Sequence, residues 1–407
     1  MANGGGLGAF VDLLRIPGAA AFSGVGVFAR LPIAMIGLGI VLLVTSTTPS
    51  YAVAGALAAA FALAAALLGP IGARFVDRLG QGRVLPVLAA GQAVGLLLLV
   101  AGLNQGWPWP LLFGIAVAAG GIGPNIGSLV RARWIALLQR DQRLRAAFAW
   151  ESIVDEVVFI LGPPLATGLA LGIAPATPLL VAAALVLSGS LALARQHATE
   201  PPPSPVARGT RTGHAVRLGG MPAIIGLMAL LGAVFGSLEV TTVAYAEEQG
   251  APQAAGWVLA LYAAGSLVGG LLMGALRPTG LVTRQLLLAS ALLALVSAPL
   301  PLVSGLGWLS LLALGAGLAV APVLILATSL VELLVPAARI TEALTLTSSG
   351  IAVGLAIAAP LAGAIIDRND ASSGYLIMAG AALGALILML LTRRGLLRRE
   401  LAATPGG

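Results

Sequence analysis

Three carboxylates lie close together in one apolar stretch of this chain. The segment "ESIVDEVVFILGPP" carries Glu151, Asp155 and Glu156 ahead of a long apolar run. In a helix that enters from the cytoplasm near residue 147, Glu151 lies near the mouth, while Asp155 and Glu156 lie close to the midplane. Glu151 and Asp155 share a face, and Glu156 lies beside it. We expect one proton-carrying carboxylate, Glu156 in preference to Asp155, and one structural ion pair.

Other polar side chains inside apolar stretches complete the set of candidates. Arg30, in "VFARLPIAM", is the natural counter-ion for Asp155 or Glu156, unless it extends to the cytoplasmic interface. Glu239, in "FGSLEVTTV", is a candidate for proton coupling or, together with Arg30, for contact with a polar or zwitterionic substrate. The alternative is that Glu239 only bonds a neighbouring helix. Asn125 is a weaker candidate for lining a substrate cavity.

The composition requires a membrane. Of the 407 residues, 59% are hydrophobic and only 9% are charged, which indicates a polytopic membrane protein. Cysteine is absent and the two histidines lie in one polar segment, which argues against metal or thiol chemistry. We expect no cofactor, no metal and no nucleic-acid partner, and no cleavable signal peptide is visible.

Apolar runs long enough to span a bilayer recur along the chain, and lipid requires them to be helices. All 22 basic residues are arginines, and all but Arg30 and Arg368 fall on the side of both termini, which predicts that this side is cytoplasmic. The twelve expected spans are 19–46, 51–73, 84–103, 108–131, 147–171, 177–195, 218–245, 253–276, 285–304, 307–333, 343–366 and 374–392.

A polar segment divides these spans six and six. "RQHATEPPPSPVARGTRTGHAVR" contains three consecutive prolines and is expected to be a solvated linker. The Pro-Leu-Ala of 164–166 also aligns with that of 360–362, which suggests a parallel repeat. The expected divisions are a cytoplasmic N-terminus (1–17), a first bundle (18–195), a cytoplasmic linker (196–217), a second bundle (218–392) and a cytoplasmic tail (393–407).

The segment "GARFVDRLGQGRVL" (72–85) resembles the loop signature of the major facilitator superfamily (MFS). Asp77, Arg78 and Gly80 fit that signature and Arg83 follows, but Gln81 and Gly82 stand where basic residues are usual. The resemblance implies two pseudo-symmetric six-helix bundles. It also implies that the loop is a conformational latch, in which Asp77 meets the start of the helix at 343–366.

Gly162 and Pro163 resemble the core of the motif of MFS antiporters, although most flanking glycines are missing. Alternatively, the pair only bends its helix for packing. The resemblance implies a monomeric secondary transporter of the bacterial cytoplasmic membrane, of the efflux type, exporting a small organic molecule against protons. An uptake symporter is the alternative. An integral membrane enzyme is another alternative, but it would need a convergent nucleophile, base or set of metal ligands, and the sequence offers none. A sensor is a further alternative, and it would normally carry an added soluble domain.

Overall fold

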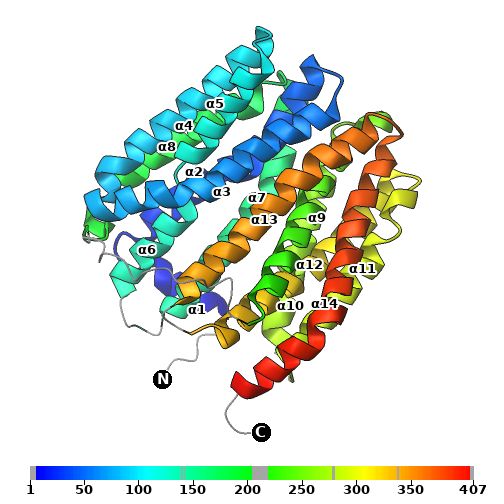
Figure 1. The fold of residues 1–407 in the computed structure, drawn as a ribbon. Helices are drawn as coiled ribbons and strands as arrows, with labels where there is room; N and C mark the ends of the chain where they lie inside the picture. Colours follow the sequence, from blue (N-terminus) through cyan, green and yellow to red (C-terminus); the bar gives the residue numbers. More distant parts are fainter. Residues whose placement is uncertain are drawn as a thin grey trace.

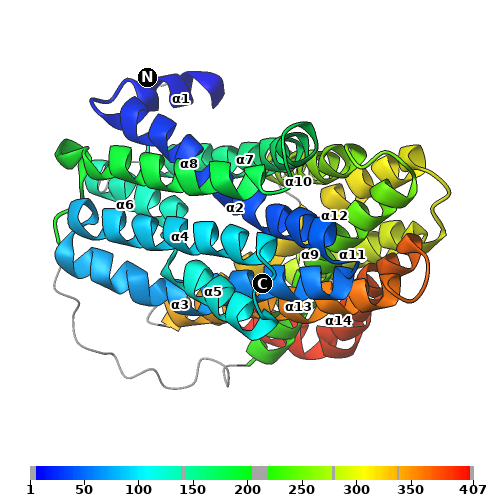
Figure 2. The same cartoon turned by 90° about the horizontal axis from the view of Figure 1, so that it is seen from above.

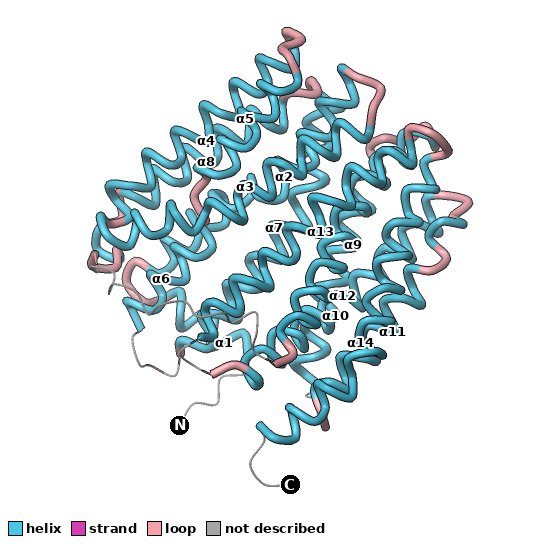
Figure 3. The backbone as a smooth tube through the Cα atoms, viewed as in Figure 1, coloured by secondary structure: helices cyan, strands magenta, loops and turns pink. Residues whose placement is uncertain are grey.

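The structure is a computed structural model that describes residues 6–138, 141, 143–203, 219–276, 280–336 and 339–403, and this part of the chain is helical without strands (Figure 3). It contains twelve segments long and apolar enough to cross a membrane. The prediction of an all-helical protein with twelve spans is therefore confirmed.

A short helix, α1 (Gly6–Leu14), comes first. The others are α2 (Ala19–Thr47), α3 (Tyr51–Leu79), α4 (Gln81–Asn104), α5 (Trp109–Ile122), α6 (Ile126–Leu138), α7 (Leu144–Gly172), α8 (Thr177–Ala194), α9 (Met221–Glu248), α10 (Ala254–Leu276), α11 (Val282–Ser297), α12 (Leu306–Leu334), α13 (Ile340–Ile366) and α14 (Tyr375–Ala403).

The helices form two bundles that lie side by side, α2 to α8 in one and α9 to α14 in the other (Figures 1 and 2). The bundles meet mainly along α3 with α13 and α7 with α10. Glycines bring the backbones together at both contacts: a Cβ atom on Gly55 would lie 2.6 Å from the Ala359 carbonyl oxygen, and one on Gly256 2.7 Å from that of Pro163. Helices in lipid associate largely through such close packing, because burial from water supplies little driving force there.

The fourth span is two helices rather than the single one expected at 108–131. Helix α5 ends before Gly123, and Pro124 has no backbone N–H to continue the ladder. Asn125 then caps α6, because its side-chain oxygen accepts a hydrogen bond from the Ser128 N–H at 3.1 Å. The break places the start of α6 next to the interior of the first bundle.

The molecule has two membrane faces that differ in how the bundles meet. We call the face where α3 ends and α9 begins the terminal face, because helix α1 and the end of α14 lie there (Figure 1). The arginines predict this face to be cytoplasmic. The opposite face, where α2 and α13 end, is the far face. Helices α3 and α13 lie together near the far face and separate toward the terminal face (Figure 1).

A carboxylate holds the two bundles together at the far face. Asp367, directly after α13, accepts hydrogen bonds from the N–H groups of Tyr51 (2.7 Å) and Ala52 (3.1 Å) and from the Ser50 hydroxyl (2.8 Å). These N–H groups belong to the first turn of α3, which has no partners within its own helix and is the positive end of its dipole. Close by, the Tyr51 hydroxyl donates to Glu247 of α9 at 2.6 Å. We call these contacts the far-face clasp.

At the terminal face, the start of the segment expected to be a solvated linker folds onto the first bundle. Thr199 is buried, and Glu200 accepts a hydrogen bond from the Gly82 N–H at 2.8 Å. Partial burial acts to raise the pKa of Glu200, but the Gly82 N–H and the neighbouring His197 outweigh it and lower that pKa below its usual value. The carboxylate is therefore ionised at neutral pH and caps the start of α4.

The second bundle repeats this arrangement. Helix α14 continues to Ala403, past the expected end at 392, and buries Glu400. Glu400 accepts hydrogen bonds from the N–H groups of Val282 (2.5 Å) and Thr283 (3.0 Å) at the start of α11. Helices α4 and α11 are the third spans of their bundles. Each is capped by a glutamate from the end of the sixth span or just beyond it, since Glu400 lies in the last turn of α14 and Glu200 lies shortly after α8. This match supports the internal repeat seen in the sequence.

The far-face clasp generates a prediction. Asp367→Ala removes the acceptor shared by Ser50, Tyr51 and Ala52, so the far-face ends of the bundles should separate. Because the chain has no cysteine, spin labels at Pro49→Cys and Gln249→Cys report their distance directly by pulsed electron paramagnetic resonance. We expect a longer, broader distance distribution than in the labelled parent protein.

Asp370→Ala is the matched control, because the Asp370 side chain bonds Ser372 within its own loop. It should leave the distribution unchanged. An unchanged distribution in Asp367→Ala would show that helix packing alone closes the far face.

Candidate functional site

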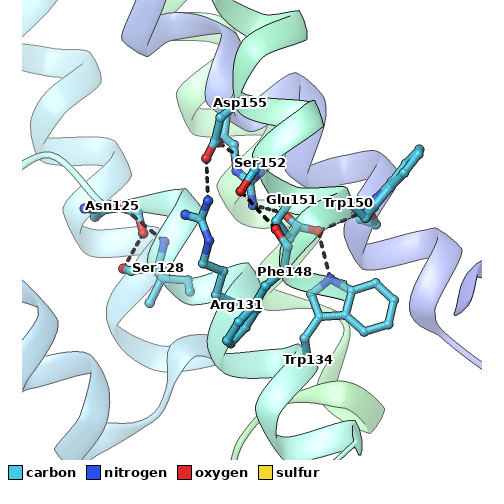
Figure 4. Close-up of polar contacts among 12 residues, drawn as sticks. Asn125, Ser128, Arg131, Trp134, Phe148, Trp150, Glu151, Ser152 and Asp155 are labelled. Atoms are coloured by element: carbon cyan, nitrogen blue, oxygen red, sulfur yellow. Dashed lines mark hydrogen bonds and ion pairs between the residues drawn. The ribbon is translucent and has the colours of Figure 1, made fainter. Parts of the chain in front are cut away.

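A chain of alternating charges runs from the interior of the first bundle to a partly exposed end. Arg30 of α2 is 4% exposed; its Nη2 donates to Glu151, and its Nη1 donates to Asp155 at 3.2 Å. Arg131 of α6 donates to the other oxygen of Asp155 at 2.5 Å (Figure 4). Two guanidinium groups and two carboxylates thus neutralise one another, which lowers the cost of placing them in a low-dielectric interior.

Glu151 is the most enclosed member of this cluster. It is 1% exposed, and the Trp134 indole donates to it at 2.7 Å (Figure 4). The Ser23 hydroxyl lies 3.5 Å from the same oxygen and accepts a hydrogen bond from the Trp150 indole at 2.8 Å. The sequence predicted that Glu151 lies near the cytoplasmic mouth, because it comes soon after the start of the span. The structure instead buries it. It is the buried anchor of Arg30.

Glu156 faces away from this cluster, as the helical spacing predicted. Its carboxylate accepts a hydrogen bond from Ser266 of α10 at 3.3 Å, across the boundary between the bundles. Of the two partners predicted for Arg30, the structure places Asp155 against it and Glu156 against the opposite bundle. Arg30 stays inside the bundle and does not extend to the interface.

Glu239 also lies at the boundary between the bundles. A Cβ atom on Gly37 of α2 would lie 2.9 Å from a Glu239 carboxylate oxygen, so the carboxylate rests against the backbone of the first bundle. No hydrogen bond or ion pair to Glu239 occurs within the described part of the chain. Arg30 and Gly37 are two turns apart on α2, so the paired arginine and the unpaired glutamate do not contact each other.

Asn125 has a local role in this structure. It is exposed and caps α6, and the Ser128 hydroxyl also donates to its carbonyl oxygen at 2.8 Å (Figure 4). By ordering the start of α6, Asn125 contributes to the position of Arg131 one and a half turns later.

Arg133 and Glu200, which sequence reasoning missed, contact the expected latch loop. Gly80 has φ +92°, a value that favours glycine. Gln81 is buried; its amide accepts from Arg133 Nε at 2.8 Å, and Arg133 also donates to the Leu193 carbonyl at 2.9 Å. Gly82 leaves room for Glu200, since a Cβ atom there would lie 3.1 Å from the Glu200 carboxylate.

The charged residues of this loop point outward. Asp77, Arg78 and Arg83 are exposed, and no hydrogen bond or ion pair joins them to other described residues. The side chains at 340–342, which begin α13, lie outside the described residues. The predicted contact of Asp77 with that helix start therefore stays a prediction.

Gly162 and Pro163 lie inside α7, which is one helix from Leu144 to Gly172. Gly162 packs tightly against Ala34 of α2, and the Pro163 carbonyl lies against Gly256 of α10. The pair therefore brings α7 close to both a neighbour in its own bundle and a partner in the other bundle. In this structure, Gly162 and Pro163 therefore make packing contacts, which is the role that the alternative interpretation gave them.

Comparison with known families decides the identity of the chain. The model of the Major Facilitator Superfamily matches residues 22–251 and 223–406. The chain belongs to the Major Facilitator Superfamily. MFS proteins are secondary transporters and not enzymes, so the prediction that the chain is not an enzyme is confirmed, as is its multi-pass membrane nature. A search of curated proteins found no match.

Solved MFS structures share the fold at low sequence identity. The nucleoside transporter NupG is 14% identical, with a TM-score of 0.69 over 92% of this chain and 98% of that one. A POT family transporter in complex with a thioalcohol-conjugated peptide is 12% identical, with a TM-score of 0.71 over 93% and 96%. A bacterial homologue of the human lysosomal transporter Spinster, inward-facing and unoccupied, is 15% identical, with a TM-score of 0.63 over 95% and 98%.

Several contacts of this MFS protein carried no signal that sequence reasoning used. The sequence indicated that Arg131 and Arg133 were positive-inside arginines at a helix end. In the structure, Arg131 bonds Asp155 and Arg133 bonds the buried Gln81. The spacing of two between these arginines places them on different faces of α6. The available hint of an enclosed helix was Trp134, which lies one turn from the apolar residues Val130 and Leu138. Glu200 lies next to three prolines, so the sequence predicted it to be solvated, whereas it bonds the Gly82 N–H.

The Arg30 cluster generates a stability prediction. Arg30→Leu leaves Glu151 buried without its cation, and removing one partner of a buried ion pair costs about 3–5 kcal/mol. The purified variant in detergent should therefore unfold at a lower temperature than the parent protein. Tryptophan fluorescence monitors the unfolding. Removing both charges, Arg30→Leu with Glu151→Leu, should recover much of the loss.

Asp155→Asn provides the comparison, with a smaller loss expected because Asp155 is 34% exposed. If Arg30→Leu melts at the parent temperature, or if the double variant is as unstable as the single one, the cluster does not stabilise the bundle as argued.

Proposed function

We propose that this MFS transporter exports a small organic molecule across a bacterial cytoplasmic membrane in exchange for protons, with the terminal face cytoplasmic. The observation that carries the proposal is the placement of Glu156 and Glu239. Both carboxylates lie at the boundary between the bundles, and no cation pairs with either among the described residues. Asp155, in contrast, is held by two arginines.

The physical argument concerns the cost of an uncompensated charge. An ionised carboxylate without a partner is expensive in the membrane interior, whereas the neutral acid is far less so. Each of the two glutamates touches the opposite bundle, through Ser266 or Gly37. A rocking motion of the bundles changes those surroundings, and therefore changes the relative cost of the two protonation states between conformations.

The arrangement of the faces supports an inward-facing state in this proposal. The far-face clasp joins the bundles, while α3 and α13 separate toward the terminal face (Figure 1). One of the structural neighbours, the Spinster homologue, is described as inward-facing. In such a state a substrate would enter from the cytoplasm.

Export rather than uptake rests on the resemblance of Gly162 and Pro163 to the antiporter motif. Their close packing against both α2 and α10 is consistent with a role in the exchange of conformations, because α7 couples the two bundles there. Purified protein in liposomes that contain a pH-sensitive dye, challenged with a panel of compounds, tests transport and coupling together. Proton movement that follows compound addition supports antiport, and its direction separates export from symport.

The proposed function generates a prediction about proton coupling. Glu156→Gln removes one titrating group and keeps the size of the side chain, so proton-driven transport of a compound found in the panel should be lost. Exchange of that compound for itself across the liposome membrane needs no net proton transfer and should continue. Normal coupling in both Glu156→Gln and Asp155→Asn would shift the role to Glu239.

A second prediction concerns the latch loop. Asp77→Asn should slow transport several-fold, because the latch loses its charge. Equilibrium binding should stay largely intact, because Asp77 is exposed at the terminal face, about six turns along α3 from the contact of Gly55 with the other bundle. Transport rate and binding are measured on the same preparation. Loss of binding in a folded variant would contradict a role limited to conformational exchange.

A further inference from the structure

Among the described residues, the charges placed inside the two bundles do not sum to zero. Arg30 and Arg131 are matched by Glu151 and Asp155. Glu156 and Glu239 remain without a cation within the described part of the chain, and both lie at the boundary between the bundles. The boundary therefore carries an excess of two carboxylates when both are ionised.

Aromatic side chains connect these two carboxylates. Ser266, which bonds Glu156, lies one turn after Tyr262 on α10. The Tyr262 ring meets the Phe235 ring edge to face, with centroids 6.1 Å apart and an angle of 89°. Phe235 lies one turn before Glu239 on α9. The two helices thus present a continuous surface from acid through two rings to acid, which we call the acid–aromatic surface.

Burial along α9 shows that part of this surface is accessible. Between Val234 and Ala246, only Phe235 and Glu239 are not fully buried. They share one face of the helix, being four residues apart, and Glu239 identifies that face as the one toward α2. On α2, Ile33 is 68% exposed and lies one turn before Gly37, the residue that meets Glu239.

An unpaired polar group points to a ligand at this surface. Tyr262 is 6% exposed, and its hydroxyl has no hydrogen-bond partner among the described residues. A buried hydroxyl normally finds a partner, because leaving it without one is costly. A bound molecule with a polar group near Tyr262 would supply the missing contact.

We propose that the transported molecule is an organic cation with an aromatic or bulky apolar body, bound on the acid–aromatic surface. This inference rests on the proposed function, since it assigns a substrate class to the same boundary between the bundles. The Phe235 ring, which is partly exposed, attracts a cation through its quadrupole, while the Tyr262 hydroxyl offers a polar contact. Glu239 supplies the opposite charge, and Ile33 packs against the apolar body. An anion would meet two carboxylates, while the arginines are already engaged by Glu151 and Asp155.

The test uses two probes of nearly the same shape and opposite charge, tetraphenylphosphonium and tetraphenylborate. Binding to purified protein in detergent is measured by equilibrium dialysis at neutral pH, without any membrane gradient. We expect tetraphenylphosphonium to bind and tetraphenylborate to bind at least about tenfold more weakly, the factor that corresponds to one unit of log Kd.

Variants assign the binding to the surface. Glu239→Gln and Phe235→Leu should each weaken tetraphenylphosphonium binding about tenfold or more, whereas Glu239→Asp, which keeps the charge, should retain most of it. Glu332→Gln is the matched control, because Glu332 is an exposed acid of the second bundle on α12, and it should bind as the parent does. Thermal unfolding of each variant checks that it is folded.

The outcomes separate this inference from the proposed function. Equal binding of the two probes, no binding of tetraphenylphosphonium, or parent-like binding by folded Glu239→Gln and Phe235→Leu would each overturn the substrate class. Proton coupling is measured separately in the dye-loaded liposomes. Charge-selective binding without proton movement would therefore remove the antiport proposal and leave the cation site standing.

Discussion

The cost of an uncompensated charge in the membrane interior organises this molecule. Each ionised group placed there needs a partner or a change of protonation. Arg30 meets that requirement with two carboxylates, and Glu151 in turn is held by Trp134 and Ser23. The cluster ties α2, α6 and α7 into one body, so the first bundle can move as a unit. Glu156 and Glu239, which have no cation partner among the described residues, lie where the bundles meet.

The same constraint applies to the backbone at the ends of helices. The first N–H groups of a helix have no partners of their own. Within the described residues, carboxylates cap the starts of three α-helices. Glu200 caps α4, Glu400 caps α11 and Asp367 caps α3. Two of these caps act within a bundle and repeat by the internal symmetry. The third acts between bundles, so under the proposed mechanism it is the one that a rocking motion would break.

The sequence predicted the fold well because the bilayer acts on long, simple features. Twelve apolar runs and the arginine distribution need no knowledge of tertiary contacts, and most span limits fall within a few residues of the observed helices. The division of the fourth span at Pro124 was missed, although proline and glycine stood in the sequence. The end of α14 was missed because its last turns are polar and arginine-rich, and their stability comes from Glu400 docking on α11.

The site was predictable only in part, because partners come from helices distant in sequence. Spacing alone separated Glu156 from Glu151 and Asp155, as the structure has them. Spacing did not reveal that Arg131 shares Asp155, or that Gln81 and Gly82 replace basic residues because Arg133 and Glu200 occupy that place from other segments. The thin basic cluster of the loop is thus compensated by tertiary contacts that no local pattern contains.

Helices α3 and α13 run in opposite directions, and this gives the two acidic residues near their C-terminal ends related positions. Asp367 follows α13 and caps the start of α3 at the far face. Asp77 lies in the last turn of α3 at the terminal face, where α13 begins. A rigid rocking motion about the close contact of Gly55 with Ala359 moves the two ends in opposite senses. Under the proposed mechanism, the clasp at one face and the latch at the other would therefore exclude each other, so that each carboxylate stabilises one of the two states.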